Sequence, residues 1–453
     1  MPETANPTIL LGQVIAGSGA APLADGAVVV EGDQIAWVGA ERDLPDGYTS
    51  RAPRRMGGPG HTVMPGLVDA HIHIAFGEAR SEEEVALYSS VEYRALKAAW
   101  FARKVLRAGV TSAFDAATTF NVAAAVRDAI EAGMYEGPRM AVCGPQLTTY
   151  QGLEASFPAW APWPPGQAGV LVQSRDEISA VVRKQVKDGV DCIKVSGSSD
   201  VPHNTNPIDG VAFSQAEFDL IAEEAHRLNR KCAVHARSRD AVFYAARAGF
   251  DYIMHASYID DAGIEACLKA GSIVVPTLTL LANAIDPNAK RKAAVAYYSR
   301  EYEAAATNLR RAFDAGVPLA AGSESGWSTV PFGEWHGLEM QIFVEHLGLT
   351  PAQAIAAGTS VGARLLPRFQ DSVGVLAAGK FADILLLDGD PLSDITVVQQ
   401  PSRRKAVIKA GEVVDITSVI PPRKIYGYEK SQNYLQGRFL YDEARRAGVF
   451  EPS

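Results

Sequence analysis

Two histidines separated by one residue, His71 and His73, are the side chains of this sequence best placed to do chemistry. They follow residues 62–68, a mostly apolar run that predicts a buried strand. Since side chains alternate between the two faces of a strand, both imidazoles point the same way. Two imidazoles on one face at a strand end can chelate one cation. The simpler alternative is a pair of ordinary histidines near a turn.

Four more ligand-type side chains lie within or just after other apolar runs. They are Lys194 in 191–196, His235 at the end of 231–235, His255 at the end of 251–255, and Glu324 after 317–322. Each alone has a structural explanation: a hydrogen-bonded histidine, a buried ion pair for the lysine, or an ordinary loop acid. Their joint placement at predicted strand ends favours a shared metal centre.

Lys194 stands among apolar neighbours in a run that predicts a buried strand. Burial lowers the pKa of a lysine, so its amine can be neutral and reactive. Such an amine can add carbon dioxide, and the resulting carbamate is an anionic ligand whose two oxygens can bridge two metals.

The elements that must position these side chains alternate along the middle of the chain. Eight apolar runs predict strands at 62–73, 111–115, 139–143, 191–196, 231–235, 251–255, 272–277 and 317–322. Amphipathic stretches between them predict helices, including 84–107, 175–188, 214–228, 238–248 and 290–314. Several end at a glycine, as expected for a helix C-terminus. The alternation predicts an α/β fold, a (β/α)8 TIM barrel, whose chemistry lies at the C-terminal strand ends.

The two chain ends have a different character, with short β-rich runs separated by turns. Residues 26–39 predict a hairpin that turns around 31–34. The ends therefore predict a small β-sandwich domain that brackets the barrel. The expected domains are 1–66 plus 368–416 for the sandwich, 67–367 for the catalytic barrel, and 417–453 for a tail that packs on the barrel or on a partner subunit.

Two segments resemble the metal-dependent amidohydrolase superfamily, and the likeness covers nearly the whole chain. Residues 64–73, MPGLVDAHIH, resemble its opening motif, and residues 374–383 resemble its return into the sandwich. The chain is most similar to the branch with imidazolonepropionase-like hydrolases, Xaa-Pro dipeptidases, ochratoxin-type amidases, and molinate and phenylurea hydrolases. The resemblance implies that His71 and His73 bind a buried metal, that carboxylated Lys194 bridges to a second, and that His235 and His255 bind the outer one. One or two divalent ions are expected, zinc by preference, with cobalt or manganese as alternatives.

Glu324 stands where this superfamily normally has Asp, in Gly-Ser-Glu-Ser. Glutamate keeps the carboxylate but reaches one methylene further, which leaves the metal count open. In the expected reaction the metal activates water for attack on a carbonyl, and Glu324 shuttles the proton to the leaving nitrogen. His255 or a nearby donor stabilises the oxyanion.

The expected reaction is hydrolysis of an amide, urea or carbamate C–N bond. Deamination is the main competitor, but enzymes of that kind carry Glu three residues after the strand-5 histidine, where this chain has Ser238. Phosphotriester hydrolysis, dipeptide cleavage and cyclic-amide hydrolysis remain alternatives within the superfamily. A scaffold that holds no stoichiometric metal is the non-enzyme alternative.

Aromatic residues gather in two predicted loops at the catalytic end. The expected substrate-binding residues are Tyr150, Trp160, Trp163 and Trp327, together with Arg237 beside the site. Aromatic side chains there suit an apolar or aromatic small molecule, and packing against a neighbouring subunit is the alternative. The polar loop 196–210 is a candidate lid, with His203 as a surface or lid contact. The aromatic tail indicates a homo-oligomer.

Composition narrows the class of protein. The chain has 453 residues and a net charge of −9, which argues against a nucleic-acid partner. No apolar run reaches the length of a membrane span and the N-terminus lacks a basic leader, so we expect a cytoplasmic enzyme with no membrane partner. The four cysteines form no CxxC pair and are expected to be reduced core residues.

Overall fold

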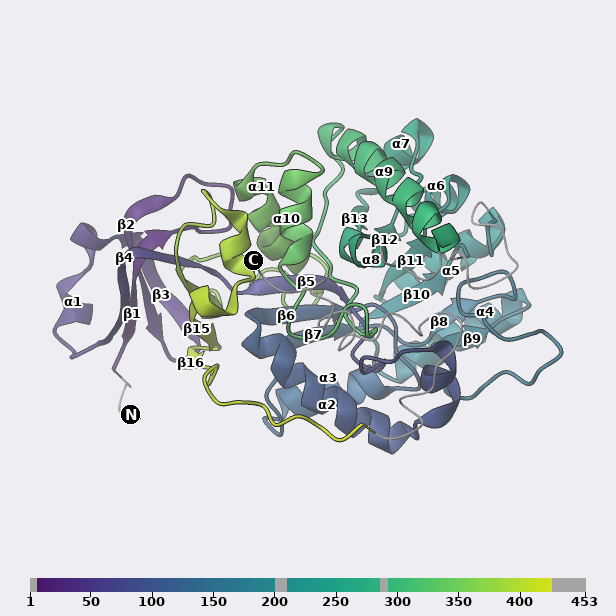
Figure 1. Ribbon diagram of the computed structural model, residues 1–453, viewed down its shortest axis with the longest axis horizontal. Helices are drawn as coiled ribbons and strands as arrows, with labels where there is room; N and C mark the ends of the chain where they lie inside the picture. Colours follow the sequence, from purple (N-terminus) through teal and green to yellow (C-terminus); the bar gives the residue numbers. More distant parts are fainter. Residues whose placement is uncertain (1–5, 200–209, 286–291, 426–453) are drawn as a thin grey trace.

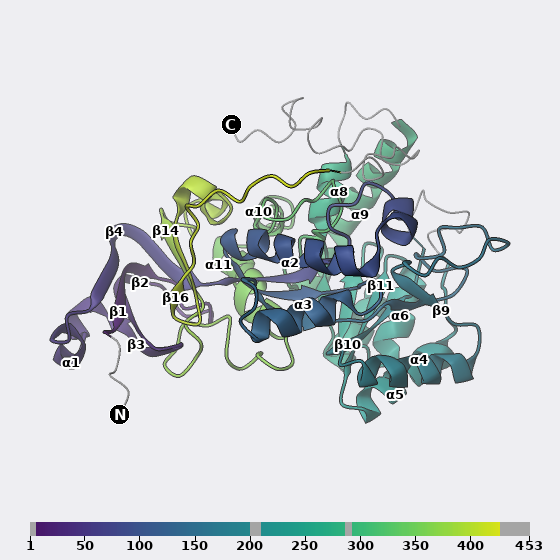
Figure 2. The same cartoon turned by 90° about the horizontal axis from the view of Figure 1, so that it is seen from below.

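A computed structural model gives the structure of the protein and describes residues 6–199, 210–285 and 292–425. Strands from both chain ends lie together at one end of the long axis, and alternating strands and helices fill the other end (Figure 1). Figure 2 shows the same separation from below. The predicted mixed α/β class is confirmed. The predicted lid with His203 and most of the tail 417–453 lie outside the described residues.

The strands from the chain ends form one seven-stranded sheet with the order β16-β15-β14-β4-β1-β2-β3. Their bounds are β1 Thr8–Val14, β2 Leu23–Glu31, β3 Gln34–Ala40, β4 Arg54–Pro65, β14 Ile384–Asp388, β15 Arg404–Lys409 and β16 Glu412–Val413. The predicted hairpin is confirmed, because β2 and β3 pair antiparallel around Gly32 and Asp33. That this sheet belongs to a two-layer sandwich stays a prediction, as do the domain boundaries.

Alternating side chains give this sheet two apolar faces. Leu10 and Val28 pack into one cluster, whereas their neighbours Ile9 and Val29 pack into another. The first cluster also contains Ile384 from the other end of the chain. Burial of this shared apolar surface therefore holds the two chain ends together.

The larger part contains two parallel sheets. One has the order β5-β6-β7, with β5 Leu67–Ile72, β6 Val110–Asp115 and β7 Arg139–Val142. The other has the order β13-β12-β11-β10-β8-β9, with β8 Gln146–Thr148, β9 Gly169–Leu171, β10 Cys192–Ser196, β11 Lys231–Ala236, β12 Tyr252–His255 and β13 Ile273–Val275. Isolated parallel bridges join Cys143 to Cys192, Val274 to Leu319, and Ile72 to Ser325.

Two predicted strands differ from the structure. The run 62–73 is not one strand, because the chain leaves β4 at Pro65 and enters β5 at Leu67, in a different sheet. Gly66 allows this passage, since a Cβ there would lie 2.1 Å from Thr111 Oγ1. The run 317–322 is not a continuous strand. It makes backbone hydrogen bonds to β13 on one side and to β5 on the other. Its strand pairing, however, is limited to an isolated bridge between Leu319 and Val274.

The helices lie largely where the amphipathic pattern places them. Their bounds are α1 Asp46–Thr49, α2 Val91–Arg107, α3 Val122–Glu131, α4 Arg175–Lys187, α5 Gln215–Arg227, α6 Arg239–Arg247, α7 Asp261–Ala270, α8 Leu278–Ala284, α9 Lys292–Asp314, α10 Leu338–Glu345 and α11 Pro351–Ala356. Short 3-10 segments are η1 Glu41–Asp43, η4 Ile395–Val398 and η5 Pro401–Arg403, and short π segments are η2 Glu84–Tyr88 and η3 Ala357–Val361. Local signals explain the ends. Ser214 and Glu217 form a capping box at α5, and Gly109 follows α2 with φ of 95°.

The described helices and the cysteines exclude two kinds of feature, a membrane-spanning helix and a disulfide among the described residues. Every helix among them is too short or too polar to cross a lipid bilayer. All four cysteines are free and buried, as predicted.

Candidate active site

Three predicted ligands meet at one point. The Nε2 atoms of His71 and His73 lie 3.1 Å apart, and the carboxylate of Glu324 lies 3.1 Å from His71 Nε2 and 3.2 Å from His73 Nε2. All three side chains are buried. The alternation along β5 thus brings the two imidazoles together as expected, and Glu324 joins them from 251 positions further along the chain.

Backbone hydrogen bonds fix Glu324 beside β5. Its N–H donates to the carbonyl of His71 at 2.8 Å, and the N–H of His73 donates to the carbonyl of Ser325 at 2.7 Å. Glu324 has φ of 62°, a left-handed conformation that is costly for a residue with a side chain. This conformation interrupts the strand pattern and turns the carboxylate toward the histidines.

His235 and His255 come from the ends of the adjacent parallel strands β11 and β12. Their ring centroids lie 4.4 Å apart, and the ring of His255 lies 5.5 Å from that of His71. His255 has φ of 72°, and its Nδ1 lies 2.6 Å from Thr277 Oγ1. The structure therefore brings both histidines to the same buried region as the first three ligands.

Lys194 is also buried, on β10 next to β11. Burial lowers the pKa of its amine, although the nearby Glu324 carboxylate favours the charged form. In turn the Lys194 charge acts on His71 and His235, so this amine belongs electrostatically to the same site. A buried amine with a lowered pKa is a better nucleophile than an exposed one.

The charge state of the site suits a divalent cation. Burial lowers the pKa of His71, His235 and His255, so the imidazoles are neutral and their ring nitrogens can ligate. Burial raises the pKa of Glu324, but a positive charge on the neighbouring His71 or His73 lowers it by more, so a cation at this position keeps the carboxylate ionised.

Two further observations show that these residues fit a metal ion. His235 Nε2 is buried with no hydrogen-bond partner among the described residues, which is costly unless a ligand completes it. His73 Nδ1 lies 3.1 Å from the carbonyl of Ala117, so Nδ1 carries the proton and Nε2 keeps its lone pair. The donor set of neutral imidazoles and a carboxylate is the kind that binds zinc and similar ions.

Asp69 and His336 support the site, and neither was predicted. Asp69 accepts the N–H groups of His71 and Ser323, both at 3.0 Å, and its other oxygen lies 2.6 Å from His336 Nδ1. The N–H of Gly333 donates to His336 Nε2, so the proton of this ring is on Nδ1 and faces Asp69. Asp69 thus ties β5 to the segment that carries Glu324. The position of Asp69 two residues before His71 could have indicated its supporting role from the sequence, whereas no local sequence pattern marks His336.

We expect His336→Ala to weaken metal retention or activity by about 10- to 100-fold, because the support of Asp69 would be lost. The check is metal content after dialysis, together with kcat/KM for any substrate the protein turns over. His346→Ala, which removes an exposed histidine, is the matched control. Equal metal content and activity in His336→Ala and the control would rule out this role.

Glu339 supports His255 indirectly, through the N-terminus of helix α8. Glu339 on α10 accepts the N–H groups of Leu278 and Thr279 at 2.9 and 2.8 Å, and so occupies the N-terminus of α8. The preceding residue, Thr277, has φ of 52° and contacts His255 Nδ1. Burial raises the pKa of Glu339 to about 7, although the hydrogen bonds from Thr279 and Leu278 lower it.

We expect Glu339 to make the folded protein less stable as the pH rises from about 5 to about 8. Because its folded pKa of about 7 lies above the ordinary 4.5, the stabilisation is complete below 4.5 and is lost as the pH passes through 7. Between about pH 5 and about pH 8, the free energy of unfolding of the unmodified protein should fall by about 2 kcal/mol more than that of Glu339→Gln. The same fall in both proteins would contradict this assignment.

The predicted substrate-binding residues differ in their exposure and in their contacts with the histidine cluster. Trp327 is half-buried and packs on Phe76 at 5.0 Å, and Phe76 stacks on the ring of His73 at 4.4 Å. Trp163 donates its Nε1–H to the carbonyl of Gly169, while Trp160 is 87% exposed. Trp327 is therefore connected to the site through Phe76.

The other two predicted substrate residues also differ in their surroundings. Tyr150 is 38% exposed. Arg237 is buried, and its guanidinium donates to Glu301 at 2.6 Å, an ion pair in which both side chains are out of solvent. Arg237 therefore already has an acidic partner within the protein.

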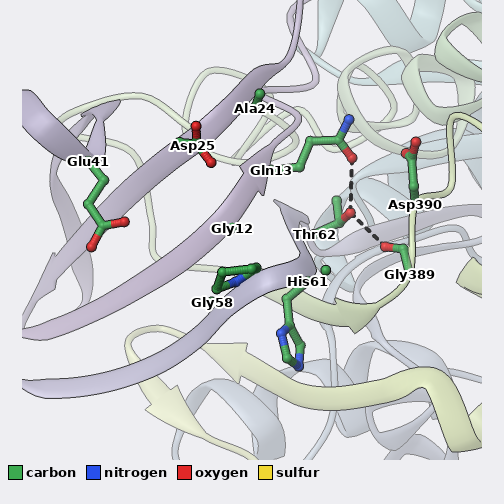
Figure 3. Close-up of a pocket in the computed structure, with 12 residues that line it drawn as sticks. Gly12, Gln13, Ala24, Asp25, Glu41, Gly58, His61, Thr62, Gly389 and Asp390 are labelled. Atoms are coloured by element: carbon green, nitrogen blue, oxygen red, sulfur yellow. Dashed lines mark hydrogen bonds between the residues drawn. The ribbon is translucent and has the colours of Figure 1, made fainter.

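A cavity of about 220 Å³ lies elsewhere, in the sheet of the chain ends (Figure 3). Its lining comes from β1, β2, β4, Glu41 of η1 and the turn at Gly389 and Asp390. Figure 3 shows the Thr62 hydroxyl bonded to Gln13 and to the Gly389 carbonyl at its edge. None of the lining residues belongs to the histidine cluster.

Comparisons with known proteins agree with this geometry. The model of the amidohydrolase family matches residues 62–414. The ochratoxinase of Aspergillus niger is 29% identical over 437 residues, covering 89% of this chain and 86% of the relative. An imidazolonepropionase of Mycolicibacterium smegmatis is 31% identical over 415 residues, covering 86% and 91%.

Solved structures give the same result. The crystal structure of A. niger ochratoxinase matches with a TM-score of 0.79 and 27% identity, covering 91% of this chain and 96% of that one. A Xaa-Pro dipeptidase with methionine bound in its active site matches with a TM-score of 0.79 and 26% identity, covering 90% and 99%. The chain belongs to the amidohydrolase family and is an enzyme that acts on amide C–N bonds.

Proposed function

We propose that the protein is a metal-dependent hydrolase that cleaves the C–N bond of an amide, urea or carbamate with an apolar or aromatic substituent. The observation that carries the proposal is the meeting of His71, His73 and Glu324 within 3.1–3.2 Å of one another in a buried site. His235, His255 and Lys194 extend the donor set around it.

The proposal includes a closed (β/α)8 barrel as the scaffold. Three parallel bridges support it, because they link the two parallel sheets and the segment around Leu319 in a ring-like order. In such a barrel the C-terminal strand ends converge on one opening. That arrangement accounts for ligands drawn from β5, β10, β11, β12 and the segment after Leu319.

One or two divalent cations, with zinc preferred, would be held by His71, His73, Glu324, His235, His255 and carboxylated Lys194. Such an ion would lower the pKa of water and polarise a carbonyl group. Glu324 accepts the proton of the attacking water as the new C–O bond forms. It then delivers that proton to the nitrogen as the C–N bond breaks.

His255 has two proposed roles that require different tautomers. If Nδ1 donates to the Thr277 hydroxyl, then Nε2 has a free lone pair and can act as a ligand. If the hydroxyl donates to Nδ1, then Nε2 carries the proton and can stabilise an oxyanion. Thr277 therefore decides which role the neutral ring plays.

Carboxylation of Lys194 is part of the proposal. The amine nitrogen forms a bond to the carbon of carbon dioxide and releases one proton to solvent, leaving an anionic carbamate. Its burial and lowered pKa support this reaction, because only a neutral amine can add carbon dioxide.

Two observations favour hydrolysis of an apolar amide over its competitors. Ser238, at the position where a deaminase of this superfamily has Glu, is the N-cap of α6 and accepts the N–H of Ala241. Trp327, Phe76 and His73 form an aromatic series leading to the ligands. The similarity to ochratoxinase supports an amide substrate, and the similarity to a Xaa-Pro dipeptidase keeps dipeptides as the second candidate.

The proposal also includes a homo-oligomer. The exposure of Trp160, an aromatic side chain that a partner subunit could cover, supports it.

A hydrolysis screen tests the function. With zinc, cobalt or manganese supplied, we expect release of amine from aryl amides, ureas or carbamates, loss of activity on chelation and recovery when metal returns. N-acyl and Xaa-Pro dipeptides form the second arm of the screen. Turnover confined to deamination of ring substrates, or activity that survives complete metal removal, would contradict the proposal.

A further inference from the structure

A second group of potential metal ligands lies away from the active site. His226 is near the end of α5, Cys232 is on β11, and Asp251 directly precedes β12. His226 Nε2 lies 2.9 Å from Asp251 Oδ2, Cys232 Sγ lies 3.5 Å from His226 Nε2, and Cys232 Sγ lies 3.7 Å from Asp251 Oδ2. Three different donor atoms, nitrogen, sulfur and oxygen, therefore face one another.

These distances resemble the edges of a zinc coordination tetrahedron. With bonds of about 2.3 Å to sulfur and about 2.0–2.1 Å to nitrogen and oxygen, the edges from sulfur are about 3.5–3.6 Å and the nitrogen–oxygen edge is about 3.4 Å. The two edges that involve Cys232 Sγ already have this length. The edge between His226 and Asp251 is shorter, as expected for a hydrogen bond that an ion would replace.

The surroundings orient the three donors. Asp251 Oδ1 is held by the ammonium of Lys231 at 2.7 Å, and Asp251 Oδ2 also accepts the N–H of Cys232 at 3.0 Å. The His226 side chain is 42% exposed, whereas Cys232 is fully buried. The cluster is thus open to solvent on its histidine side, where a water molecule can supply a fourth ligand.

The cluster is separate from the catalytic ligands. Cys232 stands near the start of β11 and His235 near its end, roughly 10 Å apart along the strand. The side chains also leave opposite faces, because Cys232 packs in the same apolar cluster as Val234, while its inward neighbour Ala233 belongs to another. An ion at Cys232 would therefore lie on the helix-covered side of the strands.

We propose that His226, Cys232 and Asp251 form a second binding site for a thiolate-seeking divalent cation such as zinc. On binding, the sulfur–hydrogen bond of Cys232 breaks, a sulfur–metal bond forms, and the proton passes to solvent. Burial raises the pKa of the Cys232 thiol, so without an ion the thiol stays protonated and packs as an apolar side chain.

Titration of the purified enzyme with Co2+ tests the site. A cysteine ligand produces a thiolate-to-cobalt charge-transfer absorption in the near ultraviolet, which imidazole and carboxylate ligands do not. We expect this absorption to saturate at one equivalent per chain beyond the active-site metal. The absorption should disappear in Cys232→Ser. In His226→Ala the apparent affinity of the site for Co2+ should fall at least tenfold.

Two comparisons make the test decisive. Cys267→Ser removes another buried thiol and should keep the absorption unchanged. His226→Ala should also keep its hydrolytic activity and its active-site metal, which separates this site from the catalytic one. Absence of the absorption in the unmodified enzyme, its retention in Cys232→Ser, an unchanged Co2+ affinity in His226→Ala, or loss of the absorption in Cys267→Ser would each overturn the proposal.

Discussion

Replacing Glu324 with glutamine is expected to lower kcat by about a hundredfold to ten-thousandfold, the usual range for a group that transfers a proton in the transition state. Glutamine keeps the size of the side chain but cannot accept and return a proton. It also removes the negative charge beside His71 and His73. The measurement is single-turnover and steady-state hydrolysis of the best substrate from the screen, with metal content determined on the same sample.

Glu324→Asp is the matched control, because it keeps the carboxylate and changes only its reach. We expect it to retain more activity than Glu324→Gln, although a shift of about 1 Å in a catalytic group can cost on the order of a hundredfold. Both variants should unfold at temperatures close to that of the unmodified protein. A glutamine variant with full activity would reject the proton-shuttle role.

Replacing Lys194 with alanine is expected to give the second-largest effect, a loss of about a thousandfold or more in kcat/KM together with lower metal content. The expectation rests on the position of Lys194, buried within the electrostatic reach of His71, His235 and Glu324. Without its carbamate, the site loses an anionic ligand that the neutral imidazoles cannot replace. The measurement is activity and bound metal, with and without added bicarbonate.

Lys97→Ala is the matched control for Lys194→Ala. Lys97 is also buried but pairs with Glu84 at 3.6 Å, so its loss should reduce stability and leave metal content unchanged. A short carboxylic acid such as propionate, which supplies the lost carboxylate, should restore part of the activity of Lys194→Ala. If Lys194→Ala binds metal and turns over substrate as the unmodified protein does, the bridging role is wrong.

The parts of the site that follow local rules could be predicted from the sequence. Alternation along a strand places His71 and His73 together, and apolar runs that end in His235 and His255 place those side chains at neighbouring strand ends. The same reasoning predicts the hairpin of β2 and β3. These features depend on residues close in sequence, so their patterns are visible in the chain itself.

Other features depend on contacts between distant residues, and no local pattern reports them. His336 contacts Asp69 across 267 positions, and Glu339 reaches the N-terminus of α8 across 61. The run 317–322 contains Pro318, which lacks an N–H to donate, and its strand pairing is limited to an isolated bridge. The left-handed backbone at Glu324 lies just beyond this run and has no signal in the sequence. The exposure of Trp160 likewise follows from how its loop lies on the surface. Such features require the folded structure.

Metal content, measured by mass spectrometry on protein purified without added metal or chelator, is the sharpest test of whether the buried histidines hold a metal ion. The measurement is best made on Cys232→Ser, so that only the active site contributes. We expect one or two equivalents of divalent metal per chain, and loss of at least one when His71 and His73 are both replaced by alanine. A folded, active protein without stoichiometric metal, or the same metal content after both replacements, would contradict it.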